Sequence, residues 1–192
     1  MIIIDDIKRA ISVMMSPAAK TKKDMGIKEG LIFVYKFALI PTILAVIITL
    51  LVARATQSFV PVLGSAFSII GTFSVIIAYI LAPLSILISA AIFHTVGKAL
   101  NIFKNDYNRS VTAFVYAAIP SLLLIWLMDI PLLGIAVSIV ALIWYFVIVS
   151  YALANQQSTT PGKAFAVVLG TTVVIALILV AVIAVIGIGF LH

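Results

Sequence analysis

Long apolar runs separated by short polar stretches dominate the pattern of this chain. A helix needs about 20 residues to cross the hydrocarbon core of a bilayer, and most of these runs have about that length. They predict five membrane-spanning helices, at Gly30–Ala53, Ile69–Phe93, Val111–Met128, Pro131–Ala154 and Ala164–Phe190. The expected fold class is therefore all-α: a polytopic membrane protein with a five-span domain over residues 29–192.

The N-terminal 28 residues have a different pattern and are expected to stay outside the bilayer core. Within Met1–Met15, apolar residues recur at the spacing of one helix face, and charged residues lie away from it. This predicts an amphipathic helix on an anionic inner leaflet, followed by a basic linker. A helix packed against the span bundle is the alternative. The residues predicted to contact the membrane surface are Ile4, Ile7, Lys8, Arg9 and Ile11.

The region Phe59–Val96 is apolar nearly throughout and too long for one straight span. It contains prolines and glycines, which interrupt helices. We expect Phe59–Ser68 to form an outer-face loop or a short re-entrant piece, and the second span to kink at Pro83. The alternative divides the region into two spans, which makes six in total.

The distribution of positive charge decides between these topologies. Ten of the twelve lysines and arginines lie before the first span, between the second and third spans, or between the fourth and fifth spans. Positively charged loops stay in the cytoplasm, so we expect five spans in the cell membrane, with the N-terminus cytoplasmic and the C-terminus outside. Six spans would place Lys98, Lys104 and Arg109 outside.

The composition argues against an enzyme. The chain is 65% hydrophobic and 9% charged, and it has no cysteine, which excludes thiolate metal sites and cysteine nucleophiles. Only two of the six acids adjoin, and neighbouring residues on a helix point about 100° apart, which makes a poor acid/base pair. No basic stretch is interleaved with aromatic residues. We therefore expect no catalytic residues, no cofactor, no metal and no nucleic-acid partner.

Polar residues gather at the predicted inner end of the second span. His94 and Lys98 share a helix face there, and this group forms either a binding pocket or a solvated interfacial cluster. Lys36 lies about 9 Å deep in the first span, where its stem can snorkel to the interface or bind an ion or anionic lipid. The candidate functional cluster comprises Lys36, His94, Lys98, Asn101, Asp106 and Tyr107.

Small residues repeat at four-residue spacing on two spans. Ser85 and Ser89 share a face of the second span, and Ala113, Ala117 and Ser121 share a face of the third. Such faces allow helix backbones to approach closely. They suit packing within the chain, and they equally suit a homo-oligomer.

Four stretches of the chain carry a resemblance to a known family. They are IKRAISVMMSP, HTVGKALN, YNRSVTAFVYAAIP and STTPGKA, at residues 7–17, 94–101, 107–120 and 158–164. Their order and spacing resemble the prokaryotic branch of the YIP family (Ypt-interacting protein, the Yip-one domain). The resemblance implies five spans and a cytoplasmic N-terminus. Eukaryotic members are associated with Rab/Ypt GTPases and vesicle traffic. This chain lacks their long N-terminal region and their Asp-Leu-Tyr-Gly-Pro signature, so we expect no GTPase partner.

Two functions are compatible with these features. The first is a non-enzymatic membrane adaptor or organiser, which acts through helix contacts, its basic inner face and its N-terminal helix. Its expected partners are anionic lipids of the inner leaflet, other membrane proteins or further copies of the chain. The alternative is a small oligomeric transporter or channel that uses Lys36, Pro83 and the cluster around His94.

Overall fold

The computed structural model describes residues 2–189, and the side chains of 6–60, 62, 64, 65 and 68–184. The chain forms helices joined by short connections. In chain order, the helices are α1 (Ile2–Met15), α2 (Pro17–Lys20), α3 (Gly26–Phe59), α4 (Pro61–Ala99), α5 (Tyr107–Met128), α6 (Leu133–Gln157) and α7 (Pro161–Gly189).

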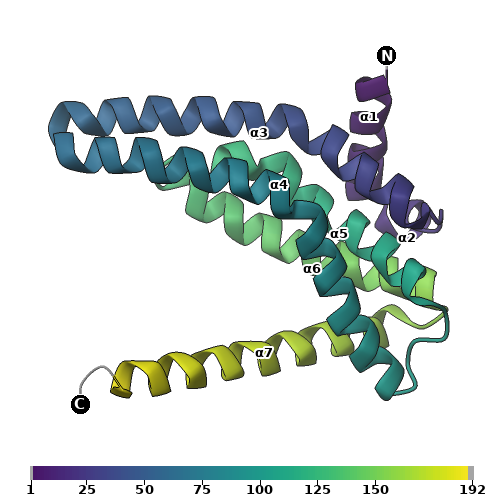
Figure 1. The fold of residues 1–192 in the computed structure, drawn as a ribbon. Coiled ribbons are helices and arrows are strands. Elements are labelled where there is room, and N and C mark those ends of the chain that lie inside the picture. Colours follow the sequence, from purple (N-terminus) through teal and green to yellow (C-terminus); the bar gives the residue numbers. More distant parts are fainter. Residues whose placement is uncertain (1, 190–192) are drawn as a thin grey trace.

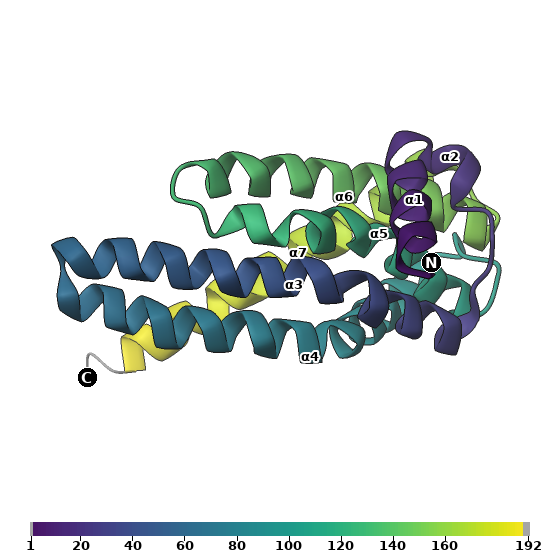
Figure 2. The same ribbon diagram turned by 90° about the horizontal axis from the view of Figure 1, so that it is seen from above.

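Within residues 2–189, five helices are long and apolar enough to cross a membrane, namely α3 to α7. Consecutive long helices run in opposite directions, and short connections join them at the two ends of the molecule (Figures 1 and 2). The predicted fold class, an all-α protein with five membrane-spanning helices and an N-terminal helix, is confirmed.

The connection between α3 and α4 is much shorter than predicted. Helix α3 continues to Phe59 and α4 begins at Pro61, so the prediction of a loop or re-entrant piece over Phe59–Ser68 is wrong. Pro61 occupies the first helical turn, where its missing N–H has no intrahelical partner to lose. Gly64 lies so close to the backbone of Gln57 that an added Cβ would collide with it. Proline and glycine usually interrupt a helix. Here they instead allow α3 and α4 to pack as a tight helical hairpin.

Helix α4 changes direction near its middle (Figure 1). Pro83 lies inside the helix and has no N–H to donate to the carbonyl of Tyr79, and its ring crowds that carbonyl. The bend agrees with the predicted kink at Pro83. It directs the second half of α4 toward α5 and α7, away from the line of α3.

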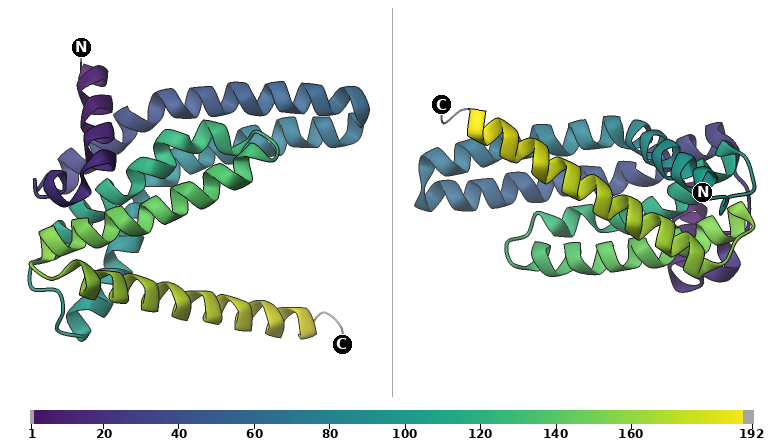
Figure 3. Two further views of the ribbon diagram at one scale, coloured as in Figure 1. Left: turned by 180° about the vertical axis from the view of Figure 1, so that it is seen from behind. Right: turned by 90° about the horizontal axis from the view of Figure 1, so that it is seen from below.

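The core is concentrated at the end of the bundle that holds α1 and α2. On α5, every residue from Ser110 to Ala117 is buried. Helix α7 joins this core only near its start, through buried residues Ala164, Val167 and Val168, and then diverges from the other long helices (Figures 1 and 3). From Thr172 to Ala184, every described side chain except the half-buried Ile175 is exposed, as suits a helix in contact with lipid.

Helix α1 lies across the end of the bundle (Figures 1 and 2). Ala10 and Val13 on one of its faces are completely buried against the core, whereas Ile11 and Met15 are exposed. Of the two arrangements considered for this segment, the packed helix is observed.

Candidate functional site

The structure assembles part of the polar cluster predicted at the end of the second span. His94 lies near the end of α4 and Tyr107 begins α5, and their rings meet edge to face with centroids 5.9 Å apart. His94 Nδ1 lies 2.9 Å from the hydroxyl of Ser110, a fully buried residue of α5. The Tyr107 hydroxyl donates to the carbonyl of Leu87 at 2.8 Å. These contacts fasten the last part of α4 to the start of α5.

Three further members of the predicted cluster shape the connection between α4 and α5. Asn101 adopts the left-handed backbone conformation, with φ of 56°, and its N–H donates to the carbonyl of Lys98 at 2.9 Å. The ammonium of Lys98 donates to the carbonyl of Lys104 at 3.1 Å. Asp106 is the N-cap of α5, and its carboxylate accepts the N–H of Arg109 at 3.3 Å. These residues serve a turn and a helix cap.

Lys36 lies apart from this cluster. Its neighbour Tyr35 donates to the carbonyl of Ile80, and His94 is 14 residues farther along α4. That separation corresponds to about 21 Å of helix. The Lys36 side chain is exposed, and among the described residues it forms no hydrogen bond or ion pair. Snorkelling of Lys36 to the interface stays a prediction.

A larger polar network is built on the end of α6, where the sequence predicted a loop that begins at Asn155. Helix α6 instead continues to Gln157, which is fully buried. The Gln157 amide donates to the hydroxyl of Ser110 at 2.9 Å and to the carbonyl of Asp106 at 3.0 Å. Its oxygen accepts the N–H of Asn105 at 3.0 Å. Gln157 thus joins α6 to the connection that precedes α5.

The two preceding amides hold the N-terminal segment. Gln156, also fully buried, donates to the carbonyls of Thr21 at 2.7 Å and Lys23 at 3.2 Å. Asn155 donates to the carbonyl of Ala18 at 2.9 Å and to the hydroxyl of Thr21 at 2.8 Å. A buried carbonyl left without a partner costs about 1–3 kcal/mol, so these amides stabilise the docked position of the segment.

Helix α5 contributes further contacts to the same segment. The Thr112 hydroxyl donates to the carboxylate of Asp24 at 2.9 Å, and Arg109 Nε lies 3.2 Å from that carboxylate. Tyr116, completely buried, donates its hydroxyl to the carbonyl of Lys23 at 3.0 Å. We call this set of side chains the N-terminal clasp. It consists of Asn155 and Gln156 from α6 and Arg109, Thr112 and Tyr116 from α5.

Asp24 is the charged residue through which the clasp responds to pH. Partial burial by itself raises the pKa of Asp24, but hydrogen bonds from the Gly26 N–H and the Thr112 hydroxyl favour the carboxylate, as does the positive charge of Arg109. Together these contacts hold the pKa of Asp24 below its ordinary value of 3.8. Asp24 is therefore a carboxylate at neutral pH, and it pairs with Arg109.

Helix α1 is fastened to the bundle by its buried face and by two side-chain contacts. The Arg9 guanidinium donates to the Tyr116 hydroxyl at 3.0 Å and lies over the ring of Phe33, 5.5 Å from its centroid. The indole N–H of Trp144 on α6 donates to the carbonyl of Met14 at 3.1 Å. Tyr116 therefore binds both α1 and the segment that follows α2.

The residues of α1 that were predicted to contact the membrane are divided between two environments. Arg9 and the half-buried Ile7 face the bundle. Lys8 and Ile11 are exposed. The side chain of Ile4 lies outside the described residues. Contact of α1 with lipid remains a prediction, now restricted to its outward face.

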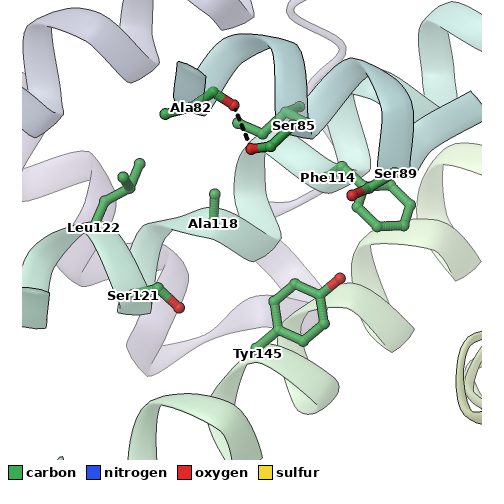
Figure 4. Close-up of a pocket in the computed structure, with 9 residues that line it drawn as sticks. Ala82, Ser85, Ser89, Phe114, Ala118, Ser121, Leu122 and Tyr145 are labelled. Carbon is green, nitrogen blue, oxygen red and sulfur yellow. Dashed lines mark hydrogen bonds between the residues drawn. The ribbon is translucent and has the colours of Figure 1, made fainter. Parts of the chain in front are cut away.

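A small cavity lies between the long helices α4, α5 and α6 (Figure 4). It is a cavity of about 230 Å³, and small residues of the predicted four-residue rows line part of it. Ser85, Ser89 and Ser121 lie there with Tyr145. The Ser85 hydroxyl donates to the carbonyl of Ala82 at 2.8 Å, so one of these hydroxyls is satisfied within its own helix.

Sequence comparison decides which family the chain belongs to. The family model of the Yip1 domain matches residues 11–183. The chain belongs to the Yip1-domain family. This is a family of non-enzymatic membrane proteins, and the five apolar helices of the chain fit a multi-pass membrane protein. The comparisons with curated proteins and with solved structures found no match.

The four stretches that carry the resemblance lie close together in the structure. Arg9 of the first stretch binds Tyr116 of the third, and His94 of the second contacts Ser110 of the third. Ser158, which begins the fourth, accepts a hydrogen bond from Asn105 at 3.2 Å. All four stretches therefore meet at the end of the bundle where the N-terminal segment is docked.

Sequence reasoning missed all five side chains of the clasp, and the amides at the end of α6 are the ones for which the sequence held a signal. Asn155, Gln156 and Gln157 were assigned to a loop because polar residues that follow an apolar run are usually solvated. Three consecutive amides were the available signal. Such side chains carry both donors and acceptors, and they suit buried backbone groups.

Proposed function

We propose that this Yip1-domain protein is a non-enzymatic membrane adaptor, and that the N-terminal segment docked by the clasp is its working surface. The family and the five apolar helices support a membrane protein without catalysis. The single observation that carries the proposal is the pair of amides, the half-buried Asn155 and the buried Gln156, that bind residues 18–23 through three backbone carbonyls and the Thr21 hydroxyl. They hold a solvent-facing segment in one shape, which is what recognition of a partner requires.

We call the docked N-terminal segment, which comprises α1, α2 and the connection to α3, the platform. Its outward side has the composition of a contact surface. Met15 is 78% exposed and Ile11 is 48% exposed, one turn apart on α1. Lys8, Lys20 and Lys22 of the same segment are also exposed. An apolar pair in a basic segment suits a protein partner at the membrane surface or the anionic leaflet itself. Further copies of the chain are a possible partner of the same class.

The proposed orientation places this platform in the cytoplasm and the end of α7 outside the cell membrane. The contacts of the clasp bring the N-terminal segment to the same end of the bundle as residues 100–106 and 158–160. Those segments hold most of the positive charge that the sequence analysis assigned to the cytoplasmic side.

Site-specific photo-crosslinking in cells tests the adaptor. A crosslinking amino acid is placed at Met15 on the platform, or at Leu132, which is 85% exposed at the opposite end of the bundle. We expect protein adducts of defined mass at Met15, reduced by Gln156→Ala, and no such adducts at Leu132. Lipid adducts alone at both positions, or adducts at Met15 that Gln156→Ala leaves unchanged, would refute the adaptor.

The alternative function, a small oligomeric transporter, is favoured by one observation. The cavity between α4, α5 and α6 contains several hydroxyl groups at the level of the long helices (Figure 4). Its test is flux across proteoliposomes. A transporter that uses this cavity should lose flux when Ser89→Leu fills it, and an adaptor should show no flux with either chain.

A further inference from the structure

A basic cavity lies between the N-terminal segment and α5. Its volume is about 610 Å³, within the range of about 300–1,000 Å³ that is usual for ligand pockets. Residues from α1, α2, the connection to α3 and α5 contribute to its wall. The charged and polar groups that matter here are Lys8, Arg9, Lys20, Lys22, Lys23 and Tyr116.

The positive charge of this cavity is only partly balanced. Glu29 is the carboxylate that approaches it, 3.8 Å from Arg9 and 3.7 Å from Lys23. Its side chain is 55% exposed, so both pairs are long, solvated contacts of small energetic value. Among the side chains that the structure describes, the five cations of the cavity form ion pairs with this one carboxylate alone, and the cavity favours a negatively charged occupant.

The arrangement of Arg9 prepares it for such an occupant. One guanidinium nitrogen donates to the Tyr116 hydroxyl at 3.0 Å. The planar group also lies over the rings of Phe33 and Tyr116, 5.5 Å and 5.8 Å from their centroids. These contacts hold the guanidinium in position, so little side-chain entropy remains to be lost when its other N–H groups bind a ligand.

We infer that this cavity binds a phosphate group. An arginine whose position is already set, together with lysines that supply charge, is a combination that suits phosphate oxygens, because charge-assisted hydrogen bonds to them are short and strong. The inference deepens the proposed function, on which it rests for the docked position of α1 and α2. It assigns to the platform a ligand bound at one site, in place of a diffuse attraction between lysines and the leaflet.

Phosphate binding at this site would also favour the docked position of the N-terminal segment. The lining residues come from α1, from α2 and from the connection that the clasp holds. A single phosphate in contact with all three would stabilise the docked segment, because a ligand that binds only the docked form shifts the equilibrium toward it. The phosphate can belong to the headgroup of an anionic phospholipid or to a soluble phosphate ester.

The test uses the full-length protein in detergent and compares two triple variants. Lys8→Gln/Lys20→Gln/Lys22→Gln removes three charges from the cavity. Lys28→Gln/Lys104→Gln/Lys163→Gln is the matched control, because it removes three exposed lysines that do not line the cavity.

Three lipid probes are compared. They are phosphatidylglycerol, oleate as an anion without phosphate, and phosphatidylcholine, and native mass spectrometry counts the lipid molecules bound to each chain. The soluble probe is glycerol 3-phosphate, followed by the shift in unfolding temperature.

We expect one saturable phosphatidylglycerol per chain, with affinity about tenfold or more weaker in the cavity variant and nearly unchanged in the control. A response to phosphatidylglycerol alone identifies a lipid headgroup, and a rise in unfolding temperature with glycerol 3-phosphate identifies a site for soluble phosphate esters as well. Equal binding of oleate and phosphatidylglycerol, or equal losses in the two variants, would overturn the inference in favour of diffuse charge attraction.

A separate measurement distinguishes failure of this inference from failure of the proposed function. Spin labels at Met15→Cys and Asn108→Cys, both exposed positions in a chain without cysteine, report whether the segment is docked. If the segment is docked but the protein binds no phosphate, the inference is wrong and the proposed adaptor function is unaffected. A segment that is undocked in the unmodified chain removes the basis of both.

Discussion

The guanidinium of Arg9 donates to the hydroxyl of Tyr116 across 3.0 Å, although the two residues are 107 positions apart. The same hydroxyl donates to the carbonyl of Lys23 at 3.0 Å. One buried phenol on α5 therefore binds α1 and the connection after α2. Because both partners depend on a single oxygen, the docking of the N-terminal segment is sensitive to changes at that atom.

Tyr116→Phe is expected to weaken this docking while the ring keeps the core filled. The change removes one of the two donors to the Lys23 carbonyl, which keeps Gln156, and leaves one Arg9 N–H without its partner, at a cost of about 1–3 kcal/mol. Pulsed EPR distances between labels at Met15→Cys and Asn108→Cys should broaden. Tyr151→Phe, at an exposed position of α6, is the control and should leave the distances unchanged. A narrow distribution in both variants would contradict the role given to this hydroxyl.

Gln156→Leu is expected to destabilise the protein by about 2 kcal/mol or more. The substitution retains an apolar side chain of similar length, but it leaves the carbonyls of Thr21 and Lys23 buried without the amide that serves them. The measurement is thermal unfolding in detergent, compared with Gln57→Leu, which changes an exposed glutamine of α3. Equal unfolding temperatures for the two variants would show that the buried amide is dispensable.

Gly97→Ala is expected to destabilise the connection between α4 and α5. A Cβ at this position would collide with the ring of Phe103, which packs directly on the glycine. Such overpacking typically costs about 1–3 kcal/mol. Gly162→Ala is the matched control, because its Cβ would meet nothing within 4 Å. Phe103→Leu should recover part of the loss caused by Gly97→Ala, and additive losses in the double variant would contradict the proposed collision.

The docking of the N-terminal segment should depend on pH in the acid range. The pKa of Asp24 is lowered in the folded protein, so its stabilising effect is fully present above the ordinary value of 3.8 and is lost as the pH falls through the lower folded value. Label distances should stay constant from neutral pH down to about pH 4 and change below it. Asp24→Asn should remove this acid transition, and a transition that persists would assign it to another group.

The proposed topology predicts that reporters fused after Lys28 and after residue 192 lie on opposite sides of the membrane. Five spans require this outcome, since the chain then crosses the bilayer an odd number of times. The positive-inside rule assigns the first fusion to the cytoplasm. Two cytoplasmic reporters would contradict both the number of spans in the membrane and the assignment of the platform.

The number and approximate position of the spanning helices could be predicted because their cause is local. A helix in lipid satisfies its own backbone hydrogen bonds, so an apolar run of sufficient length is nearly enough to specify it. Thr160 lies directly before α7, which begins at Pro161, and its hydroxyl accepts the N–H of Lys163 at 3.4 Å. Caps of this kind also depend on neighbouring residues alone.

Predictions failed where the outcome depended on how one helix packs against another. Pro61 and Gly64 suggested a loop, yet they allow α4 to pack directly on the last turn of α3. In the same way, the sequence predicted a cluster that contains Lys98, Asn101 and Asp106, but what each of them binds depends on the turn between α4 and α5.

The sequence by itself determined that this chain crosses a membrane with five helices, because hydrophobic length and the cost of unpaired backbone groups act within each segment. It also identified the stretches that are typical of the Yip1 domain. Only the tertiary structure decided that Gln156 binds Thr21 and that Arg9 faces Tyr116 instead of lipid. Buried polar groups must find partners wherever the fold brings them, and no periodicity along the chain records which partner that is.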